Sequence, residues 1–242
     1  MPLIQKFKAF YRNQGFFPGW LGIFVNPFYI ARAGLRDAMI EFAPQLSGQL
    51  LDVGCGRKPY QSLFVVEKYI GLDIDSEISR KRGIADYFYD GGKFPFEDEA
   101  FDSILCNQVL EHVFNPDNFL QEINRVLKPG GKFLLTVPFV WDEHEQPYDY
   151  ARYSSFGLRA LLEKQSFRII KHNKLGADAS IIFQLSNAYL YKITQSFPKQ
   201  IKLIFTATVM AFINGLGVIV GKYLPDNPDL FLDHVILAEK VS

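Results

Sequence analysis

Two glycines and one aspartate are the residues of this chain whose spacing points most directly to a ligand. Gly54 and Gly56 follow a short apolar run, a pattern that predicts a buried parallel strand ending in a tight turn. Having no Cβ atom, these glycines let the backbone approach a bound molecule closely. A dinucleotide site would need a third glycine where Pro59 stands. The next apolar run, residues 69–72, ends at Asp73, where an acid can hold ribose hydroxyls. These residues indicate a nucleoside-type ligand without a pyrophosphate.

A second group of residues could transfer a proton. His112 follows the fourth predicted strand, and His144 lies in a loop together with Asp149 and Arg152. An imidazole has an intrinsic pKa suited to a general base near neutral pH. The alternative for His112 is a histidine at a helix N-terminus that only bonds a backbone group. Arg152 would either bind an anionic group of a substrate in bidentate fashion or pair with Asp149.

The segments around the glycines and Asp73 resemble class I S-adenosylmethionine-dependent methyltransferases. Residues 51–56 (Leu-Asp-Val-Gly-Cys-Gly) and 71–73 (Gly-Leu-Asp) carry this resemblance, and residues 94–138 are similar to the central block of the type 11 methyltransferase group. The resemblance implies S-adenosylmethionine as the cofactor, with contacts at Asp52, Gly54, Cys55, Gly56, Asp73, Ile74, Asp90 and Asn107. For Asp90, which would meet the adenine amino group, the alternative is an Asx-turn beside two glycines.

The resemblance also implies what the second group of residues would do. A sulfonium methyl group is already activated, so such an enzyme needs positioning of the acceptor and removal of its proton. We therefore expect His112, His144 and Asp149 to be catalytic, with the base left open between the two histidines. We expect no metal ligands, because Cys55 and Cys106 each end a predicted strand and are better explained as buried, reduced thiols.

Alternating strand and helix patterns must position these residues. They predict an α/β fold with a Rossmann-like, seven-stranded, mostly parallel sheet whose last strand is antiparallel. The predicted strands are residues 50–53, 68–72, 85–89, 101–106, 132–137, 167–171 and 230–238. Helices are expected at 35–42, 60–66 and 156–165, and a further helix is expected to begin at Pro116 after the cap residue Asn115.

Two segments fall outside this minimal fold. We expect residues 1–45 to form an aromatic and basic helical extension, and residues 176–225 to form a hydrophobic helical insertion. The Rossmann-like domain would then comprise residues 46–175 and be completed by the last strand in residues 226–242.

Both additional segments favour contact with a membrane. Residues 1–36 mix aromatic side chains with five basic residues and contain no acid, which suits a membrane interface. The alternative is a helix pair that covers the substrate side of the sheet.

Residues 203–221 carry no charge and are long enough to span a bilayer, but the strands on either side of the insertion must pair in one sheet. A single crossing is therefore excluded, which leaves a helical hairpin dipping into the bilayer, an interfacial helix, a dimer interface or a buried lid. The flanking lysines are Lys192, Lys199, Lys202 and Lys222.

The composition of the chain limits the classes of partner that it could bind. The chain has 26 lysines and arginines and 26 acidic residues, so no overall charge argues for nucleic acid. Basic residues interrupt the first apolar positions, so no signal peptide is visible and we expect a cytoplasmic protein, peripheral at the inner face of the membrane. The loop 141–154 resembles that of methyltransferases encoded with surface-glycan enzymes, which implies O-methylation of a glycan or lipid-linked intermediate. The alternatives are a small soluble or quinone-like acceptor with the insertion as a lid, and a non-catalytic scaffold that binds the cofactor.

Overall fold

The structure is a computed structural model that describes residues 3–241, without the side chains of residues 3, 4 and 6–8. The chain divides into two compact units. The sheet unit comprises residues 39–139, 143–173 and 233–242, and the helical unit comprises residues 1–38, 140–142 and 174–232. Each unit is built from segments that lie far apart in the sequence.

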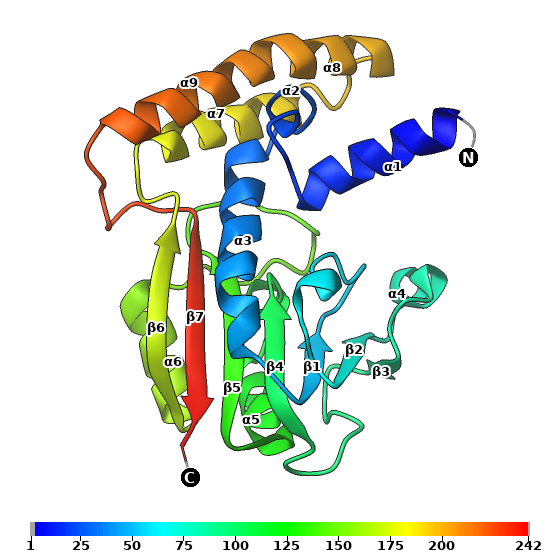
Figure 1. The fold of residues 1–242 in the computed structure, drawn as a ribbon, viewed down its shortest axis with the longest axis vertical. Coiled ribbons are helices and arrows are strands. Elements are labelled where there is room, and N and C mark those ends of the chain that lie inside the picture. Colours follow the sequence, from blue (N-terminus) through cyan, green and yellow to red (C-terminus); the bar gives the residue numbers. More distant parts are fainter. Residues whose placement is uncertain (1–2, 242) are drawn as a thin grey trace. The chain divides into compact units, whose positions relative to one another are not determined.

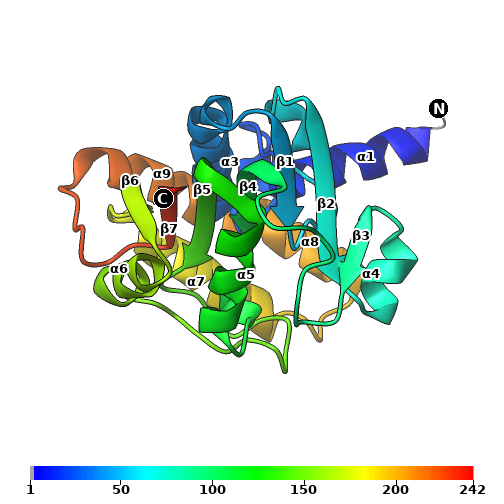
Figure 2. The ribbon, with the colours of Figure 1, turned by 90° about the horizontal axis from the view of Figure 1, so that it is seen from below.

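The sheet unit contains one seven-stranded sheet with the strand order β3-β2-β1-β4-β5-β7-β6, which can be followed in Figure 2. Strands β1 to β5 are parallel to one another, and β7 runs antiparallel to β5. The predicted Rossmann-like fold is confirmed. The strands are β1 (Gln49–Val53), β2 (Lys68–Ile74), β3 (Tyr87–Tyr89), β4 (Phe101–Asn107), β5 (Leu127–Pro138), β6 (Phe167–Leu175) and β7 (Asp233–Lys240).

The register brings the ends of the central strands to one edge. Val53 at the end of β1 pairs with Leu72 of β2 on one side and with Cys106 of β4 on the other. Asn107, the last residue of β4, pairs with Thr136 of β5. Because these strands are parallel, the loops that follow β1, β2, β4 and β5 leave the sheet at the same edge.

Short helices with well-formed caps connect the strands. The Ser76 hydroxyl accepts a hydrogen bond from Ser79 N at the start of α4, and the Ser154 hydroxyl caps α6 in the same way. Asn115 caps α5 and Pro116 occupies its first turn, as predicted. The bounds are η1 (Ala43–Gln45), η2 (Gln61–Leu63), α4 (Glu77–Arg82), η3 (Leu110–His112), α5 (Pro116–Val126) and α6 (Ser155–Lys164). The helix expected at 60–66 is only the single 3₁₀ turn η2.

The helical unit is built around an antiparallel hairpin of α7 (Ser180–Ile193) and α9 (Ala211–Tyr223) (Figure 1). Asn187 contacts Asn214, and a Cβ on Gly217 would touch Phe183, so α9 runs back along α7. The other helices are α1 (Leu3–Phe16), α2 (Gly22–Val25), α3 (Tyr29–Phe42), α8 (Lys199–Phe205) and the π-helical turn η4 (Thr206–Met210). Helix α3 begins before the predicted residue 35, and its last four residues belong to the sheet unit.

Candidate active site

The turn after β1 is held to β2 by backbone hydrogen bonds. The N–H groups of Gly54 and Cys55 both donate to the Leu72 carbonyl, at 2.8 and 3.1 Å. Gly54 has a φ of +70°, and a Cβ atom there would lie 2.3 Å from a methyl carbon of Val109, so this position requires glycine. At Gly56, by contrast, the nearest atoms to such a Cβ are 3.9 Å away. The turn therefore leaves room for a ligand at Gly56.

Asp73 lies beside that room. Its side chain is largely buried, and its Oδ1 accepts a hydrogen bond of 2.9 Å from Ile74 N. Burial raises the pKa of Asp73, while hydrogen bonds from the N–H groups of Ile74 and Gly56 partly offset the rise. Main-chain donors thus orient a carboxylate that can accept further hydrogen bonds from a pair of hydroxyls.

The neighbouring residues Asp52 and Cys55 are directed into the sheet unit. The Tyr69 hydroxyl donates to Asp52 Oδ2 at 2.7 Å. Burial raises the pKa of Asp52 to about 7, against the opposing effect of that hydrogen bond. Burial likewise raises the pKa of Cys55 to about 12, so this cysteine is an unreactive thiol.

The remaining predicted cofactor residues lie at the same edge of the sheet. Ile74 ends β2 and is partly exposed, and the Asn107 side chain accepts a hydrogen bond from Thr136 Oγ1 at 2.8 Å. Asp90 is exposed and accepts from Gly92 N at 3.0 Å, which is the Asx-turn contact. Asp75, two residues after Asp73, forms an ion pair with Arg80 at 2.5 Å.

A cluster of Glu111, His112 and His144 occupies the loops after β4 and β5. Glu111 Oε1 lies 3.8 Å from His112 Nε2 and 3.9 Å from His144 Nε2. Burial raises the pKa of Glu111 to about 8. The three side chains offer one ligand atom each, all within 4.8 Å of one another, so they could hold a metal ion. Residues predicted from separate segments are therefore brought together, with Glu111 as an unpredicted third member.

Asp149 and Arg152 support this cluster. Arg152 donates to the two oxygens of Asp149 at 2.6 and 2.7 Å, so it forms the Asp149 pair that was one of its two predicted roles. Asp149 Oδ2 also accepts from His144 N at 2.9 Å and lies 3.3 Å from His144 Nδ1. Burial alone would raise the pKa of Asp149, but the bonds from Arg152 and the His144 N–H outweigh it and lower the pKa to about 2. Asp149 is therefore a permanent anion that orients His144.

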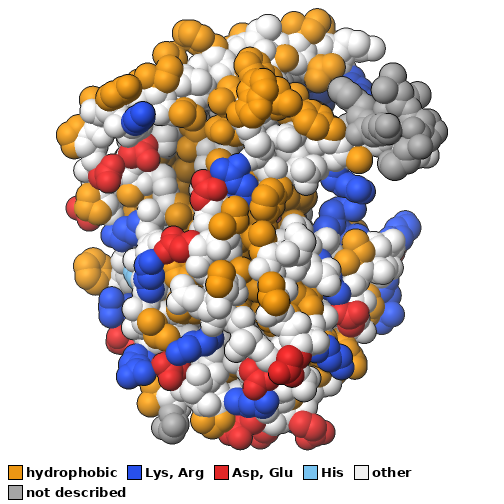
Figure 3. All heavy atoms as spheres, in the orientation of Figure 1, with side chains coloured by type: hydrophobic (Ala, Val, Ile, Leu, Met, Phe, Trp, Pro, Cys, Tyr) orange, Lys and Arg blue, Asp and Glu red, His pale blue; other side chains and the backbone are white. Residues whose placement is uncertain are grey.

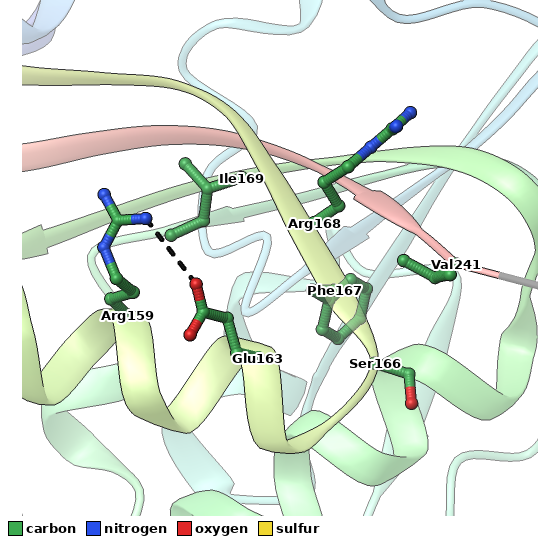
Figure 4. A pocket seen from close by; sticks show the side chains of 7 residues that line it. All are labelled: Arg159, Glu163, Ser166, Phe167, Arg168, Ile169 and Val241. Carbon is green, nitrogen blue, oxygen red and sulfur yellow. Dashed lines mark ion pairs between the residues drawn. The ribbon is translucent and has the colours of Figure 1, made fainter.

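The cluster and the glycine turn lie at the same edge of the sheet. The negative charge of Glu145, next to His144 in the loop after β5, contributes to the raised pKa of Asp73. The loop therefore lies close enough to Asp73 for the two charges to interact. A surface pocket lies between α6 and β6 (Figure 4). Its residue Phe167 begins β6 and its residue Val241 follows β7, and Val241 N donates to the Ser166 carbonyl at 2.9 Å. Near this end of β7, Glu239 pairs with Lys132 in the first half of β5, so the pocket lies at the opposite end of the sheet.

Comparison with known proteins identifies the domain. A family model described as a methyltransferase domain matches residues 51–135. The chain contains a class I S-adenosylmethionine-dependent methyltransferase domain. The cofactor of this domain is S-adenosylmethionine. The matched residues include the glycine turn, Asp73 and both Glu111 and His112, whereas His144 and Asp149 lie beyond them.

Individual relatives are similar over parts of their length. An uncharacterized protein of Methanocaldococcus jannaschii is 40% identical over 93 residues, which is 37% of this chain and 44% of that protein. A fatty-acid O-methyltransferase of Mycolicibacterium smegmatis is 37% identical over 100 residues, 36% of each chain. The chain thus spans less than half the length of the curated relatives that it matches first.

Solved structures share the fold of the methyltransferase domain. The phosphoethanolamine N-methyltransferase 2 of Haemonchus contortus, solved in complex with S-adenosyl-L-methionine, has a TM-score of 0.54 and 20% identity. The similarity covers 92% of this chain and 56% of that one. At this level of identity the likeness supports the fold, and the acceptor must be argued from the residues of the site.

Sequence reasoning missed two features of the methyltransferase domain. Glu111 stands in an otherwise apolar run before His112, and such an isolated acid in a buried segment is a signal that could have marked it. The second is a histidine pair, in which His172 Nε2 lies 2.8 Å from His234 Nδ1 while His234 Nε2 bonds the Tyr153 carbonyl. No spacing rule joins these two histidines, because they come from neighbouring strands far apart in the chain.

Proposed function

We propose that this protein is an S-adenosylmethionine-dependent O-methyltransferase that acts on a lipid-linked or glycan acceptor at the cytoplasmic face of a membrane. The observation that carries the methyl-transfer part is the shared edge of the sheet. There the Gly56 turn and Asp73, which suit the cofactor, lie near a histidine–carboxylate cluster that suits a protic acceptor. Glu145 links the two halves through its effect on Asp73.

The proposed chemistry needs two contributions from the chain. Holding the acceptor in line with the sulfonium methyl group supplies about 7–11 kcal/mol, and a general base adds about a hundredfold to ten-thousandfold in rate. His144 fits the base better than His112, because a carboxylate, that of Asp149, faces its Nδ1, whereas a main-chain carbonyl faces Nδ1 of His112. His112 Nδ1 is bound to the Tyr148 carbonyl at 2.9 Å, so His112 also presents Nε2.

The acceptor class is inferred from the helical unit, where the hairpin has its polar side inward. Asn214 of α9 is buried and donates to the carbonyls of Ile23 and Asn26, both at 3.0 Å. It also accepts a bond of 2.8 Å from Asn187 of α7. Glycine at 217 lets the two helices approach closely. Small residues and hydrogen-bonded amides are enriched at the interfaces between membrane helices.

The outward side of the same hairpin is apolar. The continuous helix Lys199–Tyr223 is long and apolar enough to cross a membrane, yet only 22% of its most apolar stretch is buried. Hydrophobic side chains gather on the surface of these helices in Figure 3. The large hydrophobic side chains of these helices with the greatest exposed fraction are Phe212, Ile204, Ile219, Ile182, Tyr189 and Tyr223. A surface of this kind exceeds what a soluble monomer normally exposes.

Charge favours lipid as the partner of that surface. Residues 179–225 carry four lysines and no acid. Lysines at this density beside an apolar helix suit the anionic headgroups of a cytoplasmic leaflet. The free, buried thiols of Cys55 and Cys106 support a reducing compartment. The similar fatty-acid O-methyltransferase supports oxygen on an apolar molecule as the acceptor.

Transfer of label tests the proposal. Purified protein, S-adenosylmethionine labelled in its methyl group, and a lipid or glycan extract should give labelled, extractable product. We expect His144→Ala and Asp149→Asn to lower turnover much more than cofactor affinity, because both residues lie on the acceptor side. Equal losses of cofactor binding would instead assign a structural role to the loop after β5.

Two other functions predict different results. A small soluble or quinone-like acceptor, with the hairpin as a lid, would be methylated in the aqueous fraction, and the protein would ignore liposomes. A non-catalytic scaffold would bind the cofactor with full affinity and transfer no label to any extract.

A further inference from the structure

The carboxylate of Glu111 is the starting point, because it is fully buried and poorly satisfied. Its side chain has 0% exposed surface, and neither oxygen accepts a hydrogen bond from another described residue. Its backbone carbonyl, by contrast, accepts from both Tyr150 N and Ala151 N, at 2.8 and 3.2 Å. A carboxyl group buried in this state must either hold a proton or meet a positive charge. The positions of its neighbours show what that charge would be.

The imidazoles of His112 and His144 both direct their Nε2 atoms toward Glu111. The Nδ1 atoms of His112 and His144 lie on the far side of each ring, next to the Tyr148 carbonyl at 2.9 Å and Asp149 Oδ2 at 3.3 Å. These acceptors favour the tautomer with the proton on Nδ1, so each Nε2 offers a lone pair toward the carboxylate. Arg152 Nη2 is 3.4 Å from His144 Nδ1, but it is 2.7 Å from Asp149 Oδ2 and donates there.

We propose that Glu111, His112 and His144 bind one divalent cation of the zinc class, such as Zn²⁺, Co²⁺ or Ni²⁺. Two imidazole nitrogens and one carboxylate are a common ligand set for these ions, and three protein ligands leave coordination positions open. The Tyr148 carbonyl and Asp149 complete the arrangement, since a ligating histidine usually donates its other ring N–H to such an acceptor. The ligand atoms now lie within 4.8 Å of one another, and small side-chain rotations would bring all three to about 2.0–2.2 Å from a shared ion.

The ion would act on the acceptor of the proposed reaction, and this role rests on the proposed function, whereas binding of the ion does not. An acceptor oxygen in an open position would have its pKa lowered, as water does on such ions. With the ion bound, His144 Nε2 would be a ligand and not the base, so the acceptor proton would pass to solvent, and the oxygen lone pair would then form the O–CH₃ bond as the C–S bond of the cofactor breaks. The products would be the methyl ether or ester, S-adenosylhomocysteine and one proton.

Metal titration of the full chain tests the site directly. Protein stripped with a chelator should bind one Zn²⁺ per chain by calorimetry, and Co²⁺ should give the visible absorption of a site containing nitrogen ligands. Mg²⁺ should bind at least about tenfold more weakly, because this ligand set contains two nitrogens. Asp149→Asn should weaken Zn²⁺ by about 10–100-fold through loss of the outer partner, and His144→Ala should weaken it more.

Matched variants separate the site from folding and from methyl transfer. His172→Asn, a histidine change in the same unit but outside the cluster, should keep full Zn²⁺ affinity. Glu111→Gln should lose Zn²⁺ while S-adenosylmethionine affinity and circular dichroism stay unchanged. Absence of bound Zn²⁺ and Co²⁺ in the wild type, or unchanged binding in the Glu111→Gln, His144→Ala double variant, would overturn the site. Undiminished methyl transfer by chelated protein would overturn only the role in the reaction, and missing methyl transfer despite one bound ion would count against the proposed function instead.

Discussion

At the scale of single residues, Asp73 has its hydrogen-bond geometry set by the main chain. The N–H groups of Ile74 and Gly56 fix the carboxylate, and the Gly56 turn leaves space beside it. Ribose hydroxyls donating to a carboxylate contribute roughly 1.5–3 kcal/mol each. We expect Asp73→Ala to weaken S-adenosylmethionine by at least about tenfold in calorimetry.

The neighbouring Asp75 offers the control for that variant. It is exposed and bonded to Arg80, so Asp75→Ala should leave cofactor affinity unchanged. Suppose instead that Asp75→Ala loses affinity and Asp73→Ala does not. The ribose would then be bound by Asp75, and its assignment to Asp73 would be wrong.

Asp52 should make stability depend on pH in an unusual direction. Burial raises its pKa in the folded chain to about 7, whereas an unfolded aspartate titrates near about 3.9. Between these values the folded chain holds a proton that the unfolded chain has lost. The stabilisation is therefore complete below about pH 4 and is lost as pH rises through about 7.

The conservative change Asp52→Asn checks this. Asparagine keeps an acceptor for the Tyr69 hydroxyl but cannot titrate. Urea unfolding of variant and wild type at pH 5 and pH 8 should show the variant gaining in relative stability at the higher pH. A constant difference between the two proteins would mean that Asp52 titrates normally.

At the scale of elements, the hairpin of α7 and α9 makes a prediction about lipid. Changing Lys192, Lys199 and Lys202 to glutamine removes charge without touching the apolar surface, so flotation with anionic liposomes should weaken. Flotation should also be weaker with neutral liposomes than with anionic ones for the unchanged protein. As a control, Lys164→Gln alters an exposed lysine on α6 that pairs with Asp117, and flotation should not change. A monodisperse, detergent-free dimer that ignores liposomes would contradict the lipid proposal and leave the dimer interface.

The elements also show how far sequence reasoning reaches. The positions of the strands and the start of α5 could be predicted because apolar runs, Asn115 and Pro116 are local signals. The lengths of the strands could not be predicted as well as their positions. The fifth strand was predicted at residues 132–137, but β5 already begins at Leu127. Leu127 pairs with Phe101 across a register shift, and Gly130 at a φ of +73° permits the irregular path that the sequence pattern does not reveal.

In the candidate site, too, some residues could be predicted from the sequence and others could not. Gly54, Gly56 and Asp73 could be predicted because each lies at or just after the end of a strand, and parallel strands end at one edge. The meeting of His144 with Glu111 and His112 could not, because the loop after β5 has no periodicity and its path is set by hydrogen bonds to the Glu111 carbonyl. The residue types in that loop indicated proton-transfer chemistry, but only the fold shows which side chains lie together in one cluster.

At the scale of the whole molecule, the division into two units predicts that cofactor binding survives without the hairpin. The predicted cofactor residues all lie in the sheet unit, while the hairpin lies in the other. Replacing residues 177–224 by a short Gly-Ser bridge should give a protein that binds S-adenosylmethionine with wild-type affinity and no longer floats with liposomes. Calorimetry and flotation on the same preparation check both parts. Loss of cofactor affinity in a folded, monodisperse variant would show that the hairpin contributes to the cofactor site.

The two hydrogen bonds from Tyr150 N and Ala151 N to the Glu111 carbonyl have a consequence for how acceptor preference can change over time. They join main chain to main chain, so they place few demands on the side chains of the loop that they anchor. The side chains of residues 145–148 can therefore be changed while the loop keeps its attachment to the turn after β4. A segment grafted there would leave the predicted cofactor residues of the sheet unit unchanged, so such a graft tests whether these side chains set the acceptor.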